Sequence, residues 1–452
     1  MKKIYTILLV AGILISSCSE RNKTTCDTEL LEFSDSLFQT SVDSSFIAGA
    51  SVMVYKGGEK LLDKSYGYAC LELSVPIPER GIFEIGSITK QFTSAAILKL
   101  LEDGKLSLDD DITKYLDYDT KGRIIKIKHL LNHTSGIVSY TEIPEFWNMS
   151  LHTYKRDTLV KLIEQKDFLF EPGEALIYNN SGYFFLGLII EKITGMSYEE
   201  YLAKEFFNPL GMKDTYYSSN LKIITNKVYG YNYNKDGLLQ RPYLDHTWPY
   251  SAGSLCSTTE DLLIWMTSLH EGKIFRKQLY NLLITPDKLN DGSILRYAMG
   301  LTNFSNYGNK SISHGGGING FLSETRYFPE ADLYIICLVN TTGPKGADFF
   351  ANELTWKILD KKEYDSQELD IELNSIEGKY SGQVRGRVLS LEVSALSNSI
   401  VLSTEENGEY DADTLRTYFG NNSWVDGNSI YIFTDDELRI DQVSGYLRLK
   451  KQ

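Results

Sequence analysis

The sequence predicts an α/β protein of the α+β type, with an antiparallel sheet flanked by helices and a helical subdomain inserted into it. Strand-like stretches lie at 49–70 and 311–340, and most of the chain from about 108 to 270 has helical periodicity. Strands that come first and last can pair into one sheet, which leaves the helical middle as an insertion. From residue 376 to 452, short strand-like runs are separated by Gly, Asn and Asp turns, which predicts a separate all-β, barrel-like domain.

The elements of the main domain, which we place at 29–362, follow from local patterns. Residues 28–43 have the apolar spacing of an amphipathic helix. Two β-rich runs flank Gly57-Gly58, which predicts a hairpin with a tight turn. A helix begins near Ser87 and stops near Gly104, and a last helical pattern covers 346–360. The charged stretch 363–375 is expected to be a linker to the β domain at 376–452.

The N-terminus is typical of an export signal. Two lysines precede an apolar run over 4–15, which is too short to span a bilayer comfortably. The run ends in Ile-Ser-Ser followed by Cys18, which resembles a bacterial lipobox; the alternative is an ordinary signal peptide cut near Ser17. We expect a lipoprotein signal peptide at 1–18, lipidation of Cys18 and a tether at 19–28. Acyl chains would then anchor the protein to the membrane of the bacterial cell envelope, facing the periplasm or at the outer membrane.

The overall composition excludes some classes of partner. The chain has 452 residues, 42% of them apolar and 23% charged, which is ordinary for a soluble globular protein. The formal net charge is −14, and no long run of Lys or Arg is present. Because phosphate binding needs a basic surface, nucleic acid is not an expected partner. The sequence leaves the oligomeric state open.

No metal or cofactor is expected either. The cysteines form no CxxC pair, and His129 and His133, although spaced i and i+4, lack the glutamate that a zinc-binding helix would have after the first histidine. We therefore expect these histidines to be structural.

One pair of residues indicates nucleophilic chemistry. Ser87 and Lys90 are three residues apart at the start of a helix, so they lie on one face. A buried lysine has a lowered pKa and can take the proton of a serine hydroxyl, which is otherwise a poor nucleophile. Ser219 and Lys222 have the same spacing, so the spacing alone is weak evidence. Ser87 could also be a simple N-cap and Lys90 a solvated lysine.

The segment FEIGSITKQFTSAAI, at 83–97, resembles the nucleophile motif of the penicillin-recognising serine hydrolases. That superfamily includes class C β-lactamases, penicillin-binding proteins, DD-peptidases, esterases and D-amino-acid peptidases. Its second motif is matched by Tyr178-Asn179-Asn180, which follows a Phe-Glu-Pro-Gly segment, and its third by His314-Gly315-Gly316-Gly317. The resemblance covers roughly residues 37–360.

The resemblance implies a role for each motif residue. Ser87 would be the nucleophile, and Lys90 would be the base or would share a proton with Tyr178. A lysine ammonium would favour the Tyr178 phenolate, and this tyrosine would then pass the proton to the leaving group. Asn180 would hold a substrate carbonyl and orient Lys90. Taken alone, Tyr178 could be an ordinary core tyrosine.

The third motif contains the clearest departure from the family pattern. The backbone N–H groups of Ser87 and Gly317 are the expected oxyanion hole, and Gly316 lets the strand edge approach the substrate closely. His314 stands where the β-lactamases proper have the lysine of Lys-Thr-Gly. It either replaces that positive charge or is neutral at pH 7, and we expect it to bind substrate.

The sequence thus predicts an exported serine hydrolase that works through an acyl-enzyme on an amide or ester. A D-amino-acid peptide of the cell wall is one candidate substrate, and small esters and amides are others. The alternatives are a slowly deacylating, penicillin-binding wall sensor and a true β-lactamase; His314 argues against efficient β-lactam hydrolysis. The β domain could read a ligand, cap the main domain or reach over its cleft.

Overall fold

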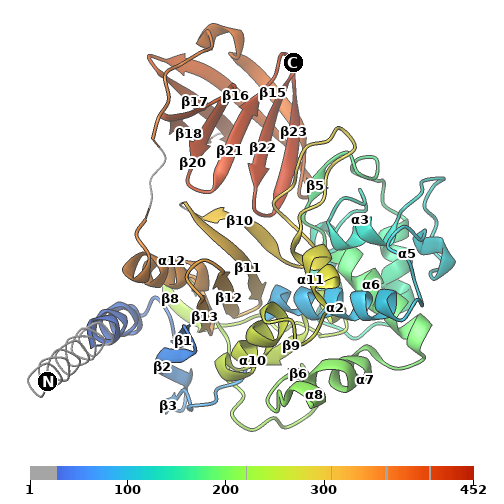
Figure 1. Cartoon of the computed structure of the whole chain (residues 1–452), viewed down its shortest axis with the longest axis vertical. Helices are drawn as coiled ribbons and strands as arrows, with labels where there is room; N and C mark the ends of the chain where they lie inside the picture. Colours follow the sequence, from blue (N-terminus) through green and yellow to red (C-terminus); the bar gives the residue numbers. More distant parts are fainter. Residues whose placement is uncertain (1–27, 220, 307, 362–364, 407–408) are drawn as a thin grey trace, which may run out of the picture.

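The computed structural model describes residues 28–219, 221–306, 308–361, 365–406 and 409–452 (Figure 1). It confirms the predicted fold class, a helix-flanked antiparallel sheet with a β-rich C-terminal domain that forms its own lobe in Figure 1. Cys18 and residues 19–27 of the predicted tether lie outside the described residues. Within the described ranges, no helix is long and apolar enough to cross a membrane.

The two strand groups pair into one seven-stranded antiparallel sheet, as the sequence predicts. Its order is β10-β11-β12-β13-β1-β2-β3, and Ala50 pairs with Val339 where the first and last groups meet. Gly57 and Gly58, both at positive φ, form the predicted turn between β1 and β2. The strands are β1 (Gly49–Lys56), β2 (Glu59–Cys70), β3 (Val75–Pro76), β10 (Thr302–Asn306), β11 (Asn309–Ile318), β12 (Phe321–Phe328) and β13 (Leu333–Val339).

Both faces of this sheet are buried. Side chains alternate along β1, so Val52 and Val54 pack on one side and Met53 on the other. The helix over 28–43 and α12 (Ala347–Ile358) cover the first face. The second face packs against α2 (Thr89–Glu102), α10 (Thr259–His270) and the helical subdomain.

The helical subdomain and its connections lie between β2 and β10. Its main helices are α3 (Ile127–Leu131), α4 (Phe146–Met149), α5 (Arg156–Glu164), α6 (Asn180–Thr194), α7 (Tyr198–Leu202), α8 (Asn208–Leu210), α9 (Tyr250–Gly253) and α11 (Lys277–Ile284). The short helical turns are η1 (Gly86–Ile88), η2 (Ile112–Lys114), η3 (Tyr140–Glu142) and η4 (Ala203–Phe207). The short strands of this region are β4 (Phe83–Glu84), β5 (Leu176–Ile177), β6 (Tyr216–Tyr217), β7 (Tyr231–Asn234), β8 (Gly237–Gln240) and β9 (Leu255–Ser257), and β14 (Thr341–Thr342) pairs with β7.

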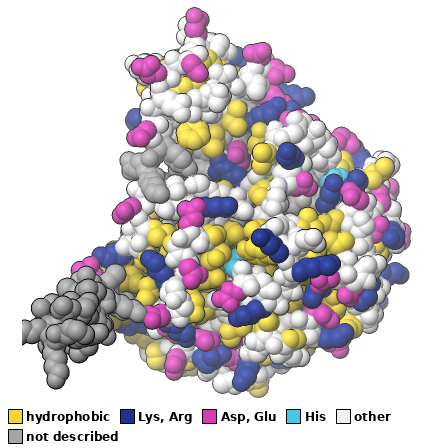
Figure 2. All heavy atoms as spheres, in the orientation of Figure 1, with side chains coloured by type: hydrophobic (Ala, Val, Ile, Leu, Met, Phe, Trp, Pro, Cys, Tyr) yellow, Lys and Arg dark blue, Asp and Glu magenta, His cyan; other side chains and the backbone are white. Residues whose placement is uncertain are grey.

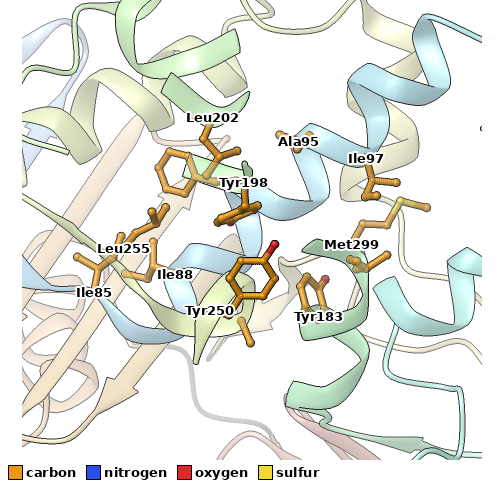
Figure 3. Packing of buried hydrophobic residues seen from close by; sticks show 14 of the residues in the cluster. Ile85, Ile88, Ala95, Ile97, Tyr183, Tyr198, Leu202, Tyr250, Leu255 and Met299 are labelled. Atoms are coloured by element: carbon orange, nitrogen blue, oxygen red, sulfur yellow. The ribbon is translucent and has the colours of Figure 1, made fainter. Parts of the chain in front are cut away.

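Helix α2 is buried on nearly all sides, among apolar and aromatic side chains from several helices (Figure 3). The Phe92 ring stacks on Trp265 of α10, with ring centroids 4.0 Å apart. The Trp265 indole N–H donates to Oε1 of Gln91 over 2.9 Å, so its polar atom is satisfied inside the core. A helix that is enclosed in this way has a fixed position, which fixes the residues at its start.

The C-terminal domain is a nearly closed sheet, and one of its strands pairs with a strand of the main domain. Its strands are β15 (Gly378–Val384), β16 (Arg387–Leu396), β17 (Ser399–Glu406), β18 (Glu409–Leu415), β19 (Thr417–Gly420), β20 (Ser423–Asp426), β21 (Ser429–Phe433), β22 (Glu437–Gln442) and β23 (Gly445–Lys451). β23 also pairs with β5, where Gly445 lies opposite Ile177. The C-terminal sheet is therefore continuous with the strand that precedes Tyr178.

The stretch expected to be a linker is partly ordered against the β domain. Leu369, Ile371 and Leu373 pack against the core that contains Trp424, and η5 (Leu373–Ser375) leads into β15. The alternation of apolar residues in Leu-Asp-Ile-Glu-Leu explains this packing, because one side of an extended chain can then face the core. These residues extend the β domain towards the main domain.

We expect Trp265→Ala to destabilise the main domain strongly. The substitution leaves a cavity beside α2 and an unpaired Gln91 amide, so the free energy of unfolding should fall by about 3–5 kcal/mol. Trp147→Ala is the matched control, because Trp147 is 69% exposed and its loss should change stability by less than about 0.5 kcal/mol. Urea denaturation followed by helical circular dichroism measures both; equal shifts would contradict this account of the core.

Candidate active site

Ser87 lies in η1, directly before α2, and its hydroxyl does not cap the helix. The N-cap positions of η1 and α2 are Ile85 and Ile88, and neither makes a side-chain capping bond. Gly86 has φ +49°, and a Cβ there would lie 2.8 Å from the backbone nitrogen of Gly317. Glycine is therefore required for η1 to approach β11, and this approach leaves the half-buried Ser87 at the strand edge.

The Lys90 amine is fully buried one turn later, among three hydrogen-bond partners. Its Nζ lies 3.1 Å from Ser87 Oγ, 2.9 Å from Asn180 Oδ1 and 2.8 Å from the carbonyl oxygen of Ala252. Burial, followed by the positive charge of Arg385, holds the pKa of Lys90 well below its usual value. The lowered pKa favours the neutral form of the amine.

The three contacts of Lys90 fix how a neutral amine is oriented. A neutral amine has two N–H donors and one lone pair, and carbonyl oxygens can only accept. In the neutral form, the two N–H groups are therefore used by Asn180 and Ala252, which leaves the lone pair for the proton of the Ser87 hydroxyl. This is the arrangement that a general base for Ser87 needs.

The Tyr178 hydroxyl is buried, although its ring is partly exposed. Its ring centroid lies 4.8 Å from Lys90 Nζ and 4.3 Å from the His133 ring. Ser87 is close enough to lower the pKa of Tyr178, but the two hydroxyls do not have hydrogen-bond geometry. Burial is the larger effect and raises that pKa, so the phenol stays protonated.

This protonation state corrects the expectation of a Tyr178 phenolate. That expectation assumed a lysine ammonium beside the tyrosine. Because burial lowers the pKa of Lys90 and raises the pKa of Tyr178, desolvation disfavours the phenolate, and Tyr178 is a phenol in the resting site.

Asn180 begins α6, and its neighbours hold it in place. The side chain of Asn179 caps the helix by accepting a hydrogen bond from the N–H of Gly182. The Asn180 backbone N–H donates to Ser139 Oγ, and its side-chain amide donates to Thr141 Oγ1 over 3.3 Å. The remaining amide oxygen of Asn180 is the atom that accepts from Lys90.

His314 is buried on β11 and is held as a neutral ring. Its Nδ1 lies 2.5 Å from the carbonyl of Gly315 and its Nε2 lies 2.9 Å from the hydroxyl of Tyr297. A carbonyl only accepts, so we assign the proton to Nδ1, and Nε2 then accepts from Tyr297. Burial lowers the pKa of His314 to about 3. Of the two interpretations left open by the sequence, the structure favours the neutral histidine.

The two glycines of the third motif have different environments. A Cβ on Gly316 would lie 2.1 Å from the carbonyl oxygen of Ile85, so only glycine allows β11 to run this close to the Ser87 turn. A Cβ on Gly317 would meet only Leu322 at 3.5 Å, which is ordinary contact. Ser87 and Gly317 line the same cleft.

The cleft has a volume of about 570 Å³ and is formed by both domains. From the main domain, the cleft is lined by residues of the three motifs: Ser87, Tyr178, Asn180, His314, Gly316 and Gly317. From the C-terminal domain, it is lined by Arg385, Asn428, Val443 and Ser444. The backbone N–H of Tyr178 also donates to the carbonyl of Ser444. In Figure 2, basic side chains gather where the C-terminal lobe meets the rest of the molecule. All the residues singled out by the three motifs therefore meet in one place.

Several contributors to the site have no sequence signal. Tyr297 contacts His314, and the Ala252 carbonyl accepts from Lys90, but neither belongs to a motif. His133 accepts a hydrogen bond from the backbone of Asn179 and packs on Tyr178, which agrees with its expected structural role. In the described part of the chain, no group of three His, Cys, Asp or Glu side chains is arranged to hold a metal ion.

Known proteins share this architecture. Penicillin-binding protein 4* of Bacillus subtilis (strain 168) is 31% identical over 63% of this chain and 66% of its own length. The octameric penicillin-binding protein homologue from Pyrococcus abyssi has a TM-score of 0.66 and 26% identity, over 93% of this chain and 100% of that one. The D-amino acid amidase from Ochrobactrum anthropi SV3 has a TM-score of 0.63 at 22% identity, over 73% and 99% of the two chains, and shares the fold. The sequence profile of the Beta-lactamase family matches residues 35–360, so this chain belongs to the beta-lactamase family of serine hydrolases.

Proposed function

We propose that this protein is an exported serine hydrolase that forms an acyl-enzyme on Ser87 with an amide or ester substrate. The observation that carries the proposal is the buried Lys90 amine, whose Nζ lies 3.1 Å from the Ser87 hydroxyl oxygen and whose pKa is lowered by burial. Export and lipidation at Cys18 rest on the N-terminal sequence alone. A location in the bacterial envelope is part of the same proposal.

The proposed reaction accounts for each proton. Ser87 Oγ attacks the substrate carbonyl and gives its proton to Lys90, while the N–H groups of Ser87 and Gly317 hold the oxyanion. When the bond to the leaving group breaks, Tyr178 protonates the leaving nitrogen or oxygen, and the Lys90 ammonium returns a proton to Tyr178. Water then attacks the ester by the same route in reverse, releasing the acid and restoring Ser87.

The substrate class that we propose first is a D-amino-acid peptide or amide. The 31% identity to a penicillin-binding protein and the fold shared with a D-amino acid amidase support it. The neutral His314 argues against the β-lactamase alternative, because it supplies no positive charge in the place of the family's lysine. The slowly deacylating binding protein differs from the hydrolase only in the lifetime of its acyl-enzyme.

Ser87→Ala should abolish covalent labelling by a fluorophosphonate and by a fluorescent penicillin. The matched control is Ser219→Ala, since Ser219 and Lys222 repeat the spacing of Ser87 and Lys90 but lie in an exposed loop. In-gel fluorescence and intact mass measure the adduct. Labelling of the Ser87→Ala protein at the wild-type level would contradict the assignment, and a penicillin adduct stable for hours with no turnover would favour the binding-protein alternative.

The pH dependence of kcat/KM should have an acid limb set by Lys90. The active form is the neutral amine, and its pKa is lowered, so activity is lost as the pH falls through a value well below 10.5. His314→Gln should leave this limb in place, because the pKa of His314 is about 3 and the ring stays neutral across the measured range. A limb near pH 10.5 would show that the resting lysine is charged.

Gly316→Ala should reduce kcat more than Gly317→Ala does. The new methyl group at Gly316 pushes β11 away from Ile85 and so displaces the oxyanion-hole N–H, which typically costs about 10²–10³ in kcat. At Gly317 the methyl group has room and the N–H is retained, so a smaller loss is expected. Steady-state kinetics with one ester substrate decide the order; equal losses would contradict the assigned packing.

A further inference from the structure

A hairpin of the C-terminal domain ends in the catalytic cleft. Val384 pairs with Arg387, so β15 and β16 are joined by only two residues, Arg385 and Gly386. Gly386 has φ +69°, a left-handed value that glycine adopts without strain. A Cβ on Gly386 would lie 2.9 Å from Cβ of Glu142, so the hairpin tip packs closely against η3 of the main domain.

The same turn brings a guanidinium to the catalytic residues. The Arg385 Cζ lies 5.6 Å from the centroid of the Tyr178 ring, and Arg385 lines the cleft together with Ser87. Its Nε donates to Oε1 of Glu142 over 3.0 Å, and this carboxylate is only 10% exposed. Glu142 thus positions Arg385 from the side facing the main domain.

The end of the Arg385 side chain is available to a ligand. Among the described residues, the two terminal nitrogens of the guanidinium have no hydrogen-bond partner, and the side chain is 53% exposed. A guanidinium has several N–H donors in one fixed plane, so its two terminal nitrogens can donate to the two oxygens of a carboxylate.

The other basic groups near the cleft are already committed. Arg326 donates to Glu324 over 2.8 Å and to Asn352 over 2.6 Å, and its side chain is 6% exposed. His314 is neutral, and the Lys90 amine is enclosed by its three partners. Of the described residues that line the cleft, Arg385 is therefore the positive charge that a substrate can reach.

We infer that Arg385 binds a carboxylate on the leaving group of the substrate, which makes the C-terminal β domain a determinant of specificity. The inference rests on the proposed function, because the leaving-group side is defined by the role of Tyr178 as its proton donor. Because the Arg385 guanidinium lies over the ring of that tyrosine, we place it on the leaving-group side of the scissile bond. The favoured substrates are amides or esters whose leaving group carries an acidic group close to the scissile bond.

The test uses two thioesters of one N-acyl-D-amino acid with the full chain. One releases mercaptoacetate and the other mercaptoacetamide; the two are close in size but differ in charge and in thiol acidity, so each kcat/KM is divided by the rate of uncatalysed hydrolysis of that thioester. Thiol release gives kcat/KM for each and also reports a single acylation burst if deacylation is slow. Wild type should prefer the carboxylate, and Arg385→Gln should lower kcat/KM for that substrate by roughly 10- to 100-fold, the loss of a charged hydrogen-bond pair.

The ratio of kcat/KM for the carboxylate thioester to that for the carboxamide is the decisive measurement, because a merely structural role of Arg385 would not change this ratio. Arg385→Gln should affect the carboxamide much less, and Arg385→Lys should retain part of the preference because the charge remains. Arg387→Gln is the matched control: Arg387 is on the same hairpin and lines a second cavity, which Arg385 also lines, but Arg387 does not line the catalytic cleft. Its preference should equal that of the wild type.

Several results would overturn the inference. An equal loss with both thioesters would mean that Arg385 only holds the domains together. A wild-type protein without a preference, or one that the fluorophosphonate labels but that releases neither thiol, would also show that Arg385 does not select the leaving group. If Ser87 is acylated by none of these reagents, the proposed function itself fails.

Discussion

The site depends on the burial of one amine. Lys90 has no exposed surface, and its Nζ is held by η1, α6 and α9 through Ser87, Asn180 and Ala252. A charged amine in this place would be costly, so burial favours the neutral form, which is the form that can act as the base we propose. The aromatic packing around α2 serves this end, because it fixes the helix that carries the lysine.

The two domains form one functional unit around the cleft. β5, which precedes Tyr178, pairs with β23, and the Tyr178 N–H donates to the carbonyl of Ser444. The backbone around a central residue of the site is therefore partly held by the C-terminal sheet. The hairpin of the same sheet places Arg385 in the cleft. The C-terminal domain therefore both holds the backbone next to Tyr178 and supplies a positively charged side chain to the cleft.

The motifs predicted the residues that meet, and the fold class followed from the order of strands and helices. What the sequence could not supply depends on contacts between distant segments. The carbonyl of Ala252 has no side-chain signature, and Tyr297 reaches His314 only because a loop leads into β10 beside it. Arg385 looks like any turn residue until the packing of two domains places it over Tyr178. The phenolate expectation for Tyr178 failed because burial, which sets both pKa values, cannot be read from motif spacing.

The charge state of Lys90 can be measured directly. Protein labelled with ¹³C at lysine Cε gives one signal for each lysine, and the spectrum of a Lys90→Met variant identifies the signal of Lys90. Its titration by NMR should show a midpoint well below 10.5, because burial disfavours the ammonium. A midpoint at or above 10.5 would mean that the resting amine is charged, and it would contradict the role of Lys90 as the base for Ser87.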